Sequence, residues 1–352
     1  MSSEEETIAI RAGENFDLEK VEQYLRDHIE DIGAGSLQVR QFPSGASNLT
    51  YLLRIGDWEG VLRRPPFGPV PPKAHDMKRE CGLLQKVNPV FPLAPKPYIF
   101  CDDPGIMDVP FYVMERRKGV VVNTSFPEGV TPTPDLCERI SHTVIDTLVQ
   151  IHGVDWQAAG LDALGHPAGF LERQVKGWIE RYQRAKTDDI PQVEPLTNWL
   201  MSHVPQSSAA TLIHNDLKLN NMMLDANDIT RPVAVFDWEM ATIGDPLFDL
   251  ATSLSYWATE DDPEELKTIL PTVTILPGFV SREHFMEMYA QKSGRDLSSM
   301  DFYMVFAYFK LVVIIQQIYV RWKRGQTQDE RFGIFGSRGQ ALLRYAAQLA
   351  GV

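Results

Sequence analysis

Cysteine is scarce in this chain: only three cysteines, Cys81, Cys101 and Cys137, occur among 352 residues. They form no Cys-x-x-Cys pair and no Cys/His pairing, so the sequence predicts neither a zinc site nor a disulfide framework. Scattered thiols fit a reducing compartment, and we expect a cytoplasmic protein. The N-terminal residues MSSEEETIAI are acidic and lack the basic-then-apolar pattern of a signal peptide.

Positive charge is also in short supply. Lysine and arginine number 34 against 47 aspartates and glutamates, which gives a formal net charge of -13 and a sequence pI near 5.1. Binding to nucleic acid or to anionic membranes depends on basic patches, so we expect neither as a partner. A local basic pocket for phosphate groups is compatible with this balance.

Long hydrophobic runs are nearly absent. The most apolar stretch, FYMVFAYFKLVVIIQQIYV at 302–320, is interrupted by Lys310, Gln316 and Gln317. It therefore falls short of the roughly 18 uninterrupted apolar residues that identify a transmembrane helix. We interpret it as part of a buried helix, and the sequence leaves open whether the protein is a monomer or a homodimer.

The chain changes character near residue 117. Before it, an amphipathic helix over 16–32 is followed by short runs rich in branched and aromatic residues, which predict a meander of antiparallel strands. The expected meander comprises SLQVRQF, LTYLLRI and WEGVLRR, and two further strands are expected at PYIF and FYVME. A proline-rich loop, RPPFGPVPPK, and a helix over 75–87 follow the third strand.

After residue 117 helical periodicity dominates, and strand signals occur at only two places. The expected helices span 133–152, 168–185, 191–203, 246–257, 281–291, 299–323 and 330–349. The sequence thus predicts an α+β, bilobal protein with a small antiparallel β-sheet lobe over 1–116 and a larger, mostly helical lobe over 117–352. A cleft between two such lobes is a common place for a ligand.

Polar side chains follow both strand signals of the helical half. Asp216 and Asn221 lie five residues apart in TLIHNDLKLNN, and Asp237 directly follows the strand VAVF. A carboxylate can accept a proton from a hydroxyl group, and Mg²⁺ prefers a few protein oxygens together with phosphate oxygens. Two acids and one amide therefore suit a site for a metal–nucleotide complex better than an all-protein metal cage.

These motifs resemble those of a known family. HNDLKLNN, VFDWE and GDPLFDLA, in this order, are similar to the catalytic layout of the aminoglycoside phosphotransferase and choline kinase family, which has a protein-kinase-like fold. The resemblance covers about residues 37–320. The runs VLRRPP, GASNLTY and LVQIHGVDW are closest to the branch whose kinase-like domain is fused in some proteins to an acyl-CoA dehydrogenase.

The resemblance implies a role for each matching residue. Asp216 would orient or deprotonate the acceptor hydroxyl, and Lys218 would neutralise charge in the transition state. Asn221 and Asp237 would hold Mg²⁺ against the phosphates of ATP or GTP. The implied nucleotide-binding residues are Ser44, Gly45, Ser47 and Asn48 in the loop over the phosphates, Arg63 with its helix partner Glu80, and Met114, Glu115 and Arg117 at the hinge that binds adenine.

The sequence departs from the family pattern in two places. SGASN is not a GxGxxG loop, and Arg63 or its neighbour Arg64 stands where the family has a phosphate-pairing lysine. A guanidinium is a planar fork rather than a point charge, but it can still neutralise phosphate and pair with Glu80. Alternation along the strand favours Arg63. We expect structural roles for His214, in the loop architecture, and for Asp249, as an inward-facing anchor of the catalytic loop.

The sequence therefore predicts a small-molecule kinase that transfers a phosphoryl group from ATP to a hydroxyl group. The branch resemblance implies a hydroxyacyl or hydroxy-acid acceptor, and an aminoglycoside antibiotic is the alternative. Polycations prefer acidic pockets, so the net charge of the pocket in the helical lobe should separate the two. A nucleotide-binding module without transfer activity is a further interpretation, supported by Arg63 and opposed by the intact Asp216, Asn221 and Asp237. A protein kinase is favoured by Lys218 but opposed by the lack of an activation segment.

Overall fold

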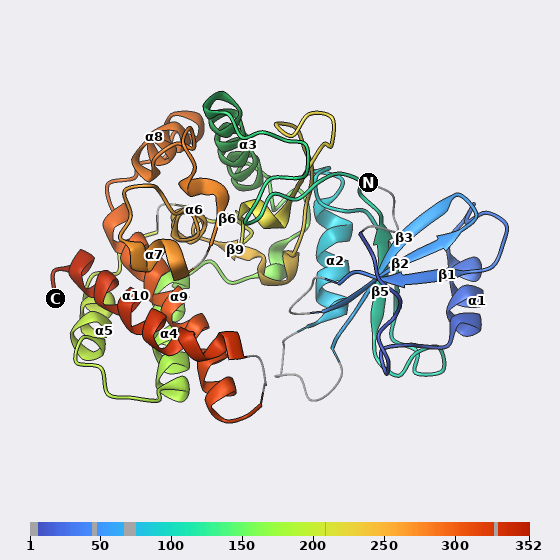
Figure 1. Ribbon diagram of the computed structural model, residues 1–352, viewed down its shortest axis with the longest axis horizontal. Coiled ribbons are helices and arrows are strands. Elements are labelled where there is room, and N and C mark those ends of the chain that lie inside the picture. The colour runs from blue at the N-terminus through green and yellow to red at the C-terminus, as the bar shows by residue number, and fades with distance from the viewer. Residues whose placement is uncertain (1–5, 44–47, 67–74, 208, 270, 327–329) are drawn as a thin grey trace. The chain divides into compact units, whose positions relative to one another are not determined.

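The computed structural model of the chain describes residues 6–43, 48–66, 75–207, 209–269, 271–326 and 330–352 (Figure 1). The chain forms two compact units. The first contains Met1–Gly119 together with the segment Val233–Glu239, and the second contains Val120–Pro232 and Met240–Val352. We expected one boundary after residue 116, whereas a short segment from far along the chain also belongs to the first unit.

A five-stranded antiparallel sheet with the order β1-β2-β3-β5-β4 forms the centre of the first unit. The strands are β1 (Gln38–Gln41), β2 (Leu49–Ile55), β3 (Trp58–Arg64), β4 (Pro97–Cys101) and β5 (Phe111–Glu115). The expected meander from β1 to β3 is confirmed, and β3 then pairs with β5 rather than with β4, the next strand along the chain. The reason is α2 (Met77–Val87), because the chain crosses over through this helix and adds β4 at the far edge, beyond β5.

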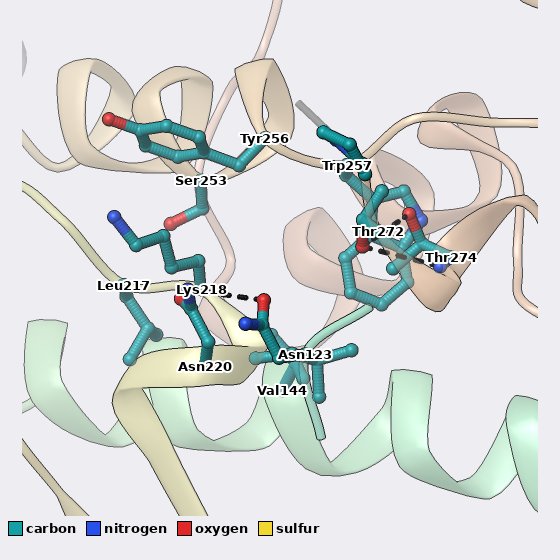
Figure 2. Close-up of a pocket in the computed structure, with 12 residues that line it drawn as sticks. Asn123, Val144, Leu217, Lys218, Asn220, Ser253, Tyr256, Trp257, Thr272 and Thr274 are labelled. Carbon is teal, nitrogen blue, oxygen red and sulfur yellow. Dashed lines mark hydrogen bonds between the residues drawn. The ribbon is translucent and has the colours of Figure 1, made fainter. Parts of the chain in front are cut away.

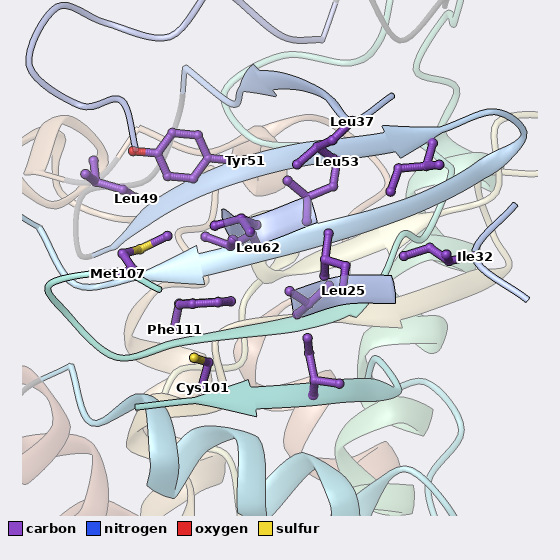
Figure 3. Close-up of a cluster of buried hydrophobic side chains, with 14 residues drawn as sticks. Leu25, Ile32, Leu37, Leu49, Tyr51, Leu53, Leu62, Cys101, Met107 and Phe111 are labelled. Atoms are coloured by element: carbon purple, nitrogen blue, oxygen red, sulfur yellow. The ribbon is translucent and has the colours of Figure 1, made fainter. Parts of the chain in front are cut away.

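Two helices cover opposite faces of this sheet (Figure 1). α1 (Leu18–His28) buries Val21 and Leu25 against sheet residues that include Leu53 and Leu62 (Figure 3). Side chains alternate between the two faces of a strand, so the neighbour of Leu62 in β3, Arg63, points to the face that α2 covers. The alternation of a buried strand thus delivers one arginine to the side of the sheet where α2 lies.

Helices form most of the second unit. They are α3 (Pro134–His152), α4 (Phe170–Ala185), α5 (Val193–Ser202), α6 (Pro246–Ser255), α7 (Glu264–Ile269), α8 (Arg282–Ser293), α9 (Met300–Lys323) and α10 (Phe335–Ala350). α9 packs against α10, α6 and α4. By length and composition α9 could cross a membrane, but 72% of its most apolar window is buried inside the structure. The interpretation of this stretch as a buried helix is confirmed.

Short elements carry the polar motifs. β6 (Thr211–Ile213) pairs antiparallel with β9 (Thr242–Gly244), with Leu212 opposite Ile243. The other short elements are β7 (Met222–Leu224), β8 (Pro232–Val235) and the 3-10 helices η1 (Asp162–Leu164), η2 (Leu219–Asn221), η3 (Trp238–Met240), η4 (Val273–Ile275) and η5 (Glu330–Ile334). The sequence analysis missed β7, β9 and α7, because elements of three to six residues are too short to show a period.

Candidate active site

Arg63 is the centre of a charged cluster in the first unit. Its guanidinium lies 3.1 Å from the carboxylate of Glu80, 2.9 Å from that of Asp237 and 3.8 Å from that of Glu239. β3 supplies Arg63, α2 supplies Glu80, and the segment after β8 supplies the other two acids. The predicted ion pair between Arg63 and Glu80 is confirmed. Arg64, the next residue, points to the opposite face of the strand.

Burial sets the charge state of this cluster. Loss of hydration raises the pKa of Glu80 to about 7, because Arg63 only partly opposes the rise while Asp237 and Glu239 add negative charge nearby. Burial also disfavours the cationic form of Arg63, but the surrounding acids, Glu80 first, outweigh it and raise the pKa of Arg63 above its usual range. One guanidinium thus faces three carboxyl groups, and the raised pKa of Glu80 lets that carboxyl take up a proton near neutral pH.

Asn48 is tied to the same cluster. Its amide donates to the Glu239 carboxylate at 3.2 Å, and its oxygen lies 2.9 Å from Nδ1 of His75. Arg79 of α2 donates to the backbone carbonyl of Glu239 at 2.8 Å. The other residues predicted in this loop lie outside the described ranges: Ser44, Gly45 and Ser47. Glu239 therefore joins the loop end to α2, a role that the sequence analysis missed: Glu239 ends the motif VFDWE, but only Asp237 of that motif was given a role.

The predicted hinge residues lie at the end of β5. The backbone N–H of Glu115 donates to the carbonyl of Lys96 at 2.8 Å, and the Glu115 carboxylate accepts the Lys96 N–H at 2.6 Å. Arg117 pairs with Glu115 at 2.6 Å and donates to the carbonyl of Pro92 at 2.7 Å. Met114 precedes them within the strand. These contacts fix the course of the chain here, and a role in binding adenine stays a prediction.

Asp216 lies in the loop between β6 and η2 of the second unit. The ammonium of Lys218 lies 3.0 and 2.9 Å from its two carboxylate oxygens. The amide nitrogen of Asn221 donates to the same carboxylate at 2.9 Å and to the backbone carbonyl of Asp216 at 2.8 Å. The structure therefore brings these three predicted residues together. Because Asn221 donates through its nitrogen, its amide oxygen remains available as a metal ligand.

Tyr256, just after α6, also contacts this group. The ammonium of Lys218 lies over its ring, 4.5 Å from the centroid. Burial, together with the charge of Asp216 and a hydrogen bond to it, raises the pKa of Tyr256 well above its usual value. The phenol therefore stays protonated in the vicinity of Asp216. The sequence analysis missed Tyr256, because an aromatic residue at a helix end usually indicates core packing.

Asp249 anchors the loop that carries Asp216. Its two carboxylate oxygens accept the backbone N–H groups of His214 and Asn215, both at 2.7 Å, and Nε2 of His152 lies 3.1 Å away. Burial opposes ionisation, but the hydrogen bonds from His152 and His214 hold the pKa of Asp249 below its usual range. The predicted anchoring role of Asp249 is confirmed, and His214 is fully buried within the loop.

A cavity of about 210 Å³ opens beside Lys218 (Figure 2). Figure 2 shows Lys218 and Tyr256 on one side of it and Trp257 on the other. The lining residues are Asn123, Val144, Leu217, Lys218, Leu219, Asn220, Ser253, Tyr256, Trp257, Pro271, Thr272 and Thr274. Among these described residues Lys218 carries the only charge and none is an acid. Amides, hydroxyls and apolar groups supply the rest of the lining, which suits a neutral or anionic molecule with an apolar part.

An antiparallel sheet with a buried Arg–Glu pair, together with a helical unit whose loop holds Asp216, Lys218 and Asn221, defines a small-molecule kinase. The chain belongs to the phosphotransferase enzyme family, whose sequence model matches residues 38–278. Acyl-CoA dehydrogenase family member 11 of Rattus norvegicus is 33% identical over 355 residues, which cover 98% of this chain and 44% of that protein. The chain thus spans less than half the length of the curated relatives that it matches.

Solved structures share the fold. A putative aminoglycoside phosphotransferase from Ralstonia eutropha JMP134 is similar with a TM-score of 0.82 and 28% identity, covering 96% of this chain and 99% of that one. A thermostable mutant of the aminoglycoside phosphotransferase APH(4)-Ia, in complex with AMP-PNP and hygromycin B, has a TM-score of 0.61 at 15% identity, covering 94% and 98%. The predicted family, its fused branch and the kinase-like α+β fold are confirmed.

Proposed function

We propose that this chain transfers the γ-phosphoryl group of ATP, or of GTP, to a hydroxyl group of a hydroxyacyl or hydroxy-acid metabolite. The observation that carries the proposal is the loop in which Asp216, Lys218 and Asn221 contact one another. Phosphoryl transfer asks a protein for positioning and charge neutralisation rather than for covalent chemistry. The AMP-PNP in the APH(4)-Ia complex supports a nucleotide as the donor.

On the acceptor side, the carboxylate of Asp216 orients the hydroxyl group and takes its proton. Lys218 neutralises the charge that spreads over the transferred phosphoryl group. In the structure Lys218 is paired with Asp216, so it exchanges part of that contact for phosphate oxygens during the reaction. Tyr256, which stays protonated near the same carboxylate, is a further donor available on this side.

On the nucleotide side, Arg63 is the candidate for the phosphate contact, because its cationic form is favoured and Glu80 orients it. Asn48 lies at the end of the loop predicted to cover the phosphates. For Met114, Glu115 and Arg117 we retain the predicted role as the hinge that binds adenine. None of these residues takes part in bond making, and all of them act by holding the donor in place.

Asn221 and Asp237, each considered by itself, offer oxygen atoms that are suitable ligands for Mg²⁺. Asn221 has an amide oxygen that its own hydrogen bonds leave available, and Asp237 lies in a cluster with more carboxyl groups than cations. Oxygen ligands of this kind, few in number and completed by phosphate oxygens and water, are typical of Mg²⁺ sites. When bound, the ion would neutralise charge on the phosphates.

The cavity favours one acceptor class. An aminoglycoside is a polycation and requires acids around it, whereas the lining described here has one lysine and no carboxylate. A hydroxy acid or hydroxyacyl group presents a hydroxyl, an apolar chain and an anionic or neutral end, which match Lys218, the apolar side chains and the hydroxyl-bearing residues. We therefore place the aminoglycoside second among the acceptors.

Phosphorus NMR with MgATP tests the proposal. Separate samples would contain hydroxyacyl-CoAs, free hydroxy acids, choline-like alcohols or aminoglycosides, with the Asp216→Asn protein as the control. We expect a new phosphomonoester signal with the hydroxy acids or their thioesters and none in the control. A signal only with aminoglycosides would overturn the acceptor assignment. Binding of ATP without any product would favour a nucleotide-binding module, and phosphorylation of peptides would favour a protein kinase.

A further inference from the structure

Lys310 is a buried lysine in the middle of α9, with 4% of its surface exposed. Its ammonium donates to the backbone carbonyl of Asn215 at 3.0 Å and lies 3.4 Å from the hydroxyl of Thr252. The rings of Trp178 and Phe248 lie 5.8 and 5.2 Å from the ammonium. Burying a charge costs free energy unless the charge is well paired. The shortest hydrogen bond of the Lys310 ammonium goes to the catalytic loop, which suggests a role for this lysine there.

Asn215 has an unusual backbone conformation. Its φ is 66°, in the left-handed region that residues other than glycine rarely adopt. Asparagine tolerates this region better than most residues, and here several contacts also hold it. Asp249 holds its N–H at 2.7 Å, the carbonyl of Met240 accepts from its side chain at 2.9 Å, and Lys310 holds its carbonyl. That carbonyl belongs to the peptide bond that joins Asn215 to Asp216.

We propose that Lys310 is a positioning residue for the catalytic loop: its ammonium fixes the peptide plane before Asp216 and thereby the direction of the Asp216 carboxylate. This inference deepens the proposed phosphotransfer and rests on it. The ammonium of Lys310 bonds to Asn215 and not to Asp216 itself. It acts through Asn215, just as Asp249 acts through the N–H groups of the same loop.

The charged groups near Lys310 come from the catalytic loop, α6 and α4. Burial lowers its pKa to about 8; Asp216 of the loop and Asp249 of α6 oppose the shift, while Lys218 of the loop and Arg181 of α4 add to it. The ammonium form therefore dominates at neutral pH and is lost above about pH 8. A neutral amine is a weaker donor to the Asn215 carbonyl, so we expect the hold on the loop to weaken as the pH rises.

Gln316, also in α9, offers a matched control. It is 6% exposed, and its amide donates at 2.9 Å both to the carbonyl of Ala185 and to the hydroxyl of Thr187. It thus shares with Lys310 the helix, the burial and a bond to a backbone carbonyl, but its partners lie outside the catalytic loop. A lysine that merely supports the packing of α9 would respond to removal as Gln316 does.

The first test follows loop motion by amide hydrogen exchange in the full chain and does not depend on turnover. We expect Lys310→Met to speed exchange at least tenfold in the peptide that covers 214–218. Gln316→Met should leave that peptide unchanged and speed exchange near 185–187 instead. Unchanged exchange of 214–218 in Lys310→Met would overturn the inference, whether or not the chain proves to be a kinase.

The second test is kinetic and applies once wild-type transfer has been observed. For Lys310→Met we expect kcat to fall at least tenfold, with the nucleotide KM within twofold of wild type. The decline of kcat above about pH 8 should vanish in Lys310→Met and persist in Gln316→Met. If Lys310→Met does not fold, Lys310→Arg is used instead. The alkaline decline of kcat in Lys310→Arg should then begin at least one pH unit higher than in wild type. An unchanged kcat, or the same alkaline decline in every variant, would overturn the positioning role.

Discussion

Asp216 and Lys218 form a two-point ion pair, with the lysine nitrogen 3.0 and 2.9 Å from the two carboxylate oxygens. The two residues are separated by one position and Lys218 is extended, so both side chains lie on the same side of the chain. Three structural features flank the pair and fix the loop: the left-handed Asn215, the Asp249 anchor and the 3-10 turn at Leu219–Asn221. The pair is thus a property of the loop conformation, and its removal should affect the reaction more than stability.

Replacing Asp216 with asparagine should nearly abolish transfer. The change removes the proton acceptor but keeps the shape of the side chain, and losses of about 10²- to 10⁴-fold in kcat are usual for such groups. Nucleotide binding should be little altered, because other residues are assigned to it. Turnover and the nucleotide-induced rise in melting temperature would be measured together. Near-normal turnover in Asp216→Asn would contradict the assigned role.

Asp237→Ala should weaken nucleotide binding mainly when magnesium is present. The change removes a proposed metal ligand and also one acid partner of Arg63. We expect the Kd for nucleotide to rise at least tenfold with Mg²⁺ and by less than threefold in EDTA. Isothermal titration in both buffers would measure this. An equal loss in both buffers would mean that Asp237 acts through Arg63 and not through the metal.

Glu80→Ala should destabilise the first unit. Removing one member of a buried ion pair commonly costs about 3–5 kcal/mol. Here we expect roughly 1–3 kcal/mol, because Asp237 and Glu239 still face Arg63 after the change. Denaturant unfolding would measure the free energy. The exposed i,i+4 pair Arg139–Asp135 is a suitable control, since Asp135→Ala should cost less than about 0.5 kcal/mol.

The pH dependence of stability should identify Lys310. Its folded-state pKa of about 8 lies below the reference value of 10.5, so between these values the unfolded chain binds a proton that the folded chain does not. Stability therefore rises with pH across this window, by up to about 3 kcal/mol at ~1.4 kcal/mol per pKa unit. The difference in unfolding free energy between wild type and Lys310→Met should follow this rise. If the difference in unfolding free energy between the two proteins does not change from pH 7.5 to 10.5, the pKa of Lys310 is not lowered in the folded state.

Asn123→Asp should impair the use of acidic acceptors. Asn123 is an exposed residue of the cavity lining, and its side-chain oxygen already accepts from Asn220 at 3.4 Å, so the isosteric acid keeps that contact. The new negative charge should raise KM for a hydroxy acid several-fold and leave kcat nearly unchanged. Asn123→Gln controls for shape. Equal KM values for the two variants would indicate that the acceptor does not approach this side of the cavity.

The hydrophobic periodicity of the sequence predicted those helices and strands that are long enough to show several repeats of the period. The strands over 49–55 and 58–64 were predicted with the bounds that the structure shows, and α3, α4 and α9 were predicted to within two residues. Spacing located Asp216, Lys218 and Asn221, because all three lie on one short loop. These predictions succeeded because each depends on neighbours along the chain.

The residues that were missed reach the site from far along the sequence. Lys310 bonds to a residue 95 positions away, and Glu239 bonds to Asn48 across 191 positions. No sequence period or motif spacing links such residues. Taken alone, Lys310 is an interruption of an apolar helix and Glu239 is a polar residue after a strand, and neither observation suggests a site. Tertiary packing alone gives them their partners.

The segment Val233–Glu239 belongs to the first unit, although most of the second unit is encoded before and after it. Asp237 is translated 174 residues after Arg63, its ion-pair partner. At the usual 5–20 residues per second, the ribosome would need on the order of 10 to 30 s to span that interval. The nascent sheet can form early, but its charged cluster is complete only after the catalytic loop, which precedes Asp237 in the sequence, has been synthesised. A chain truncated before residue 237 would carry the sheet without this acid.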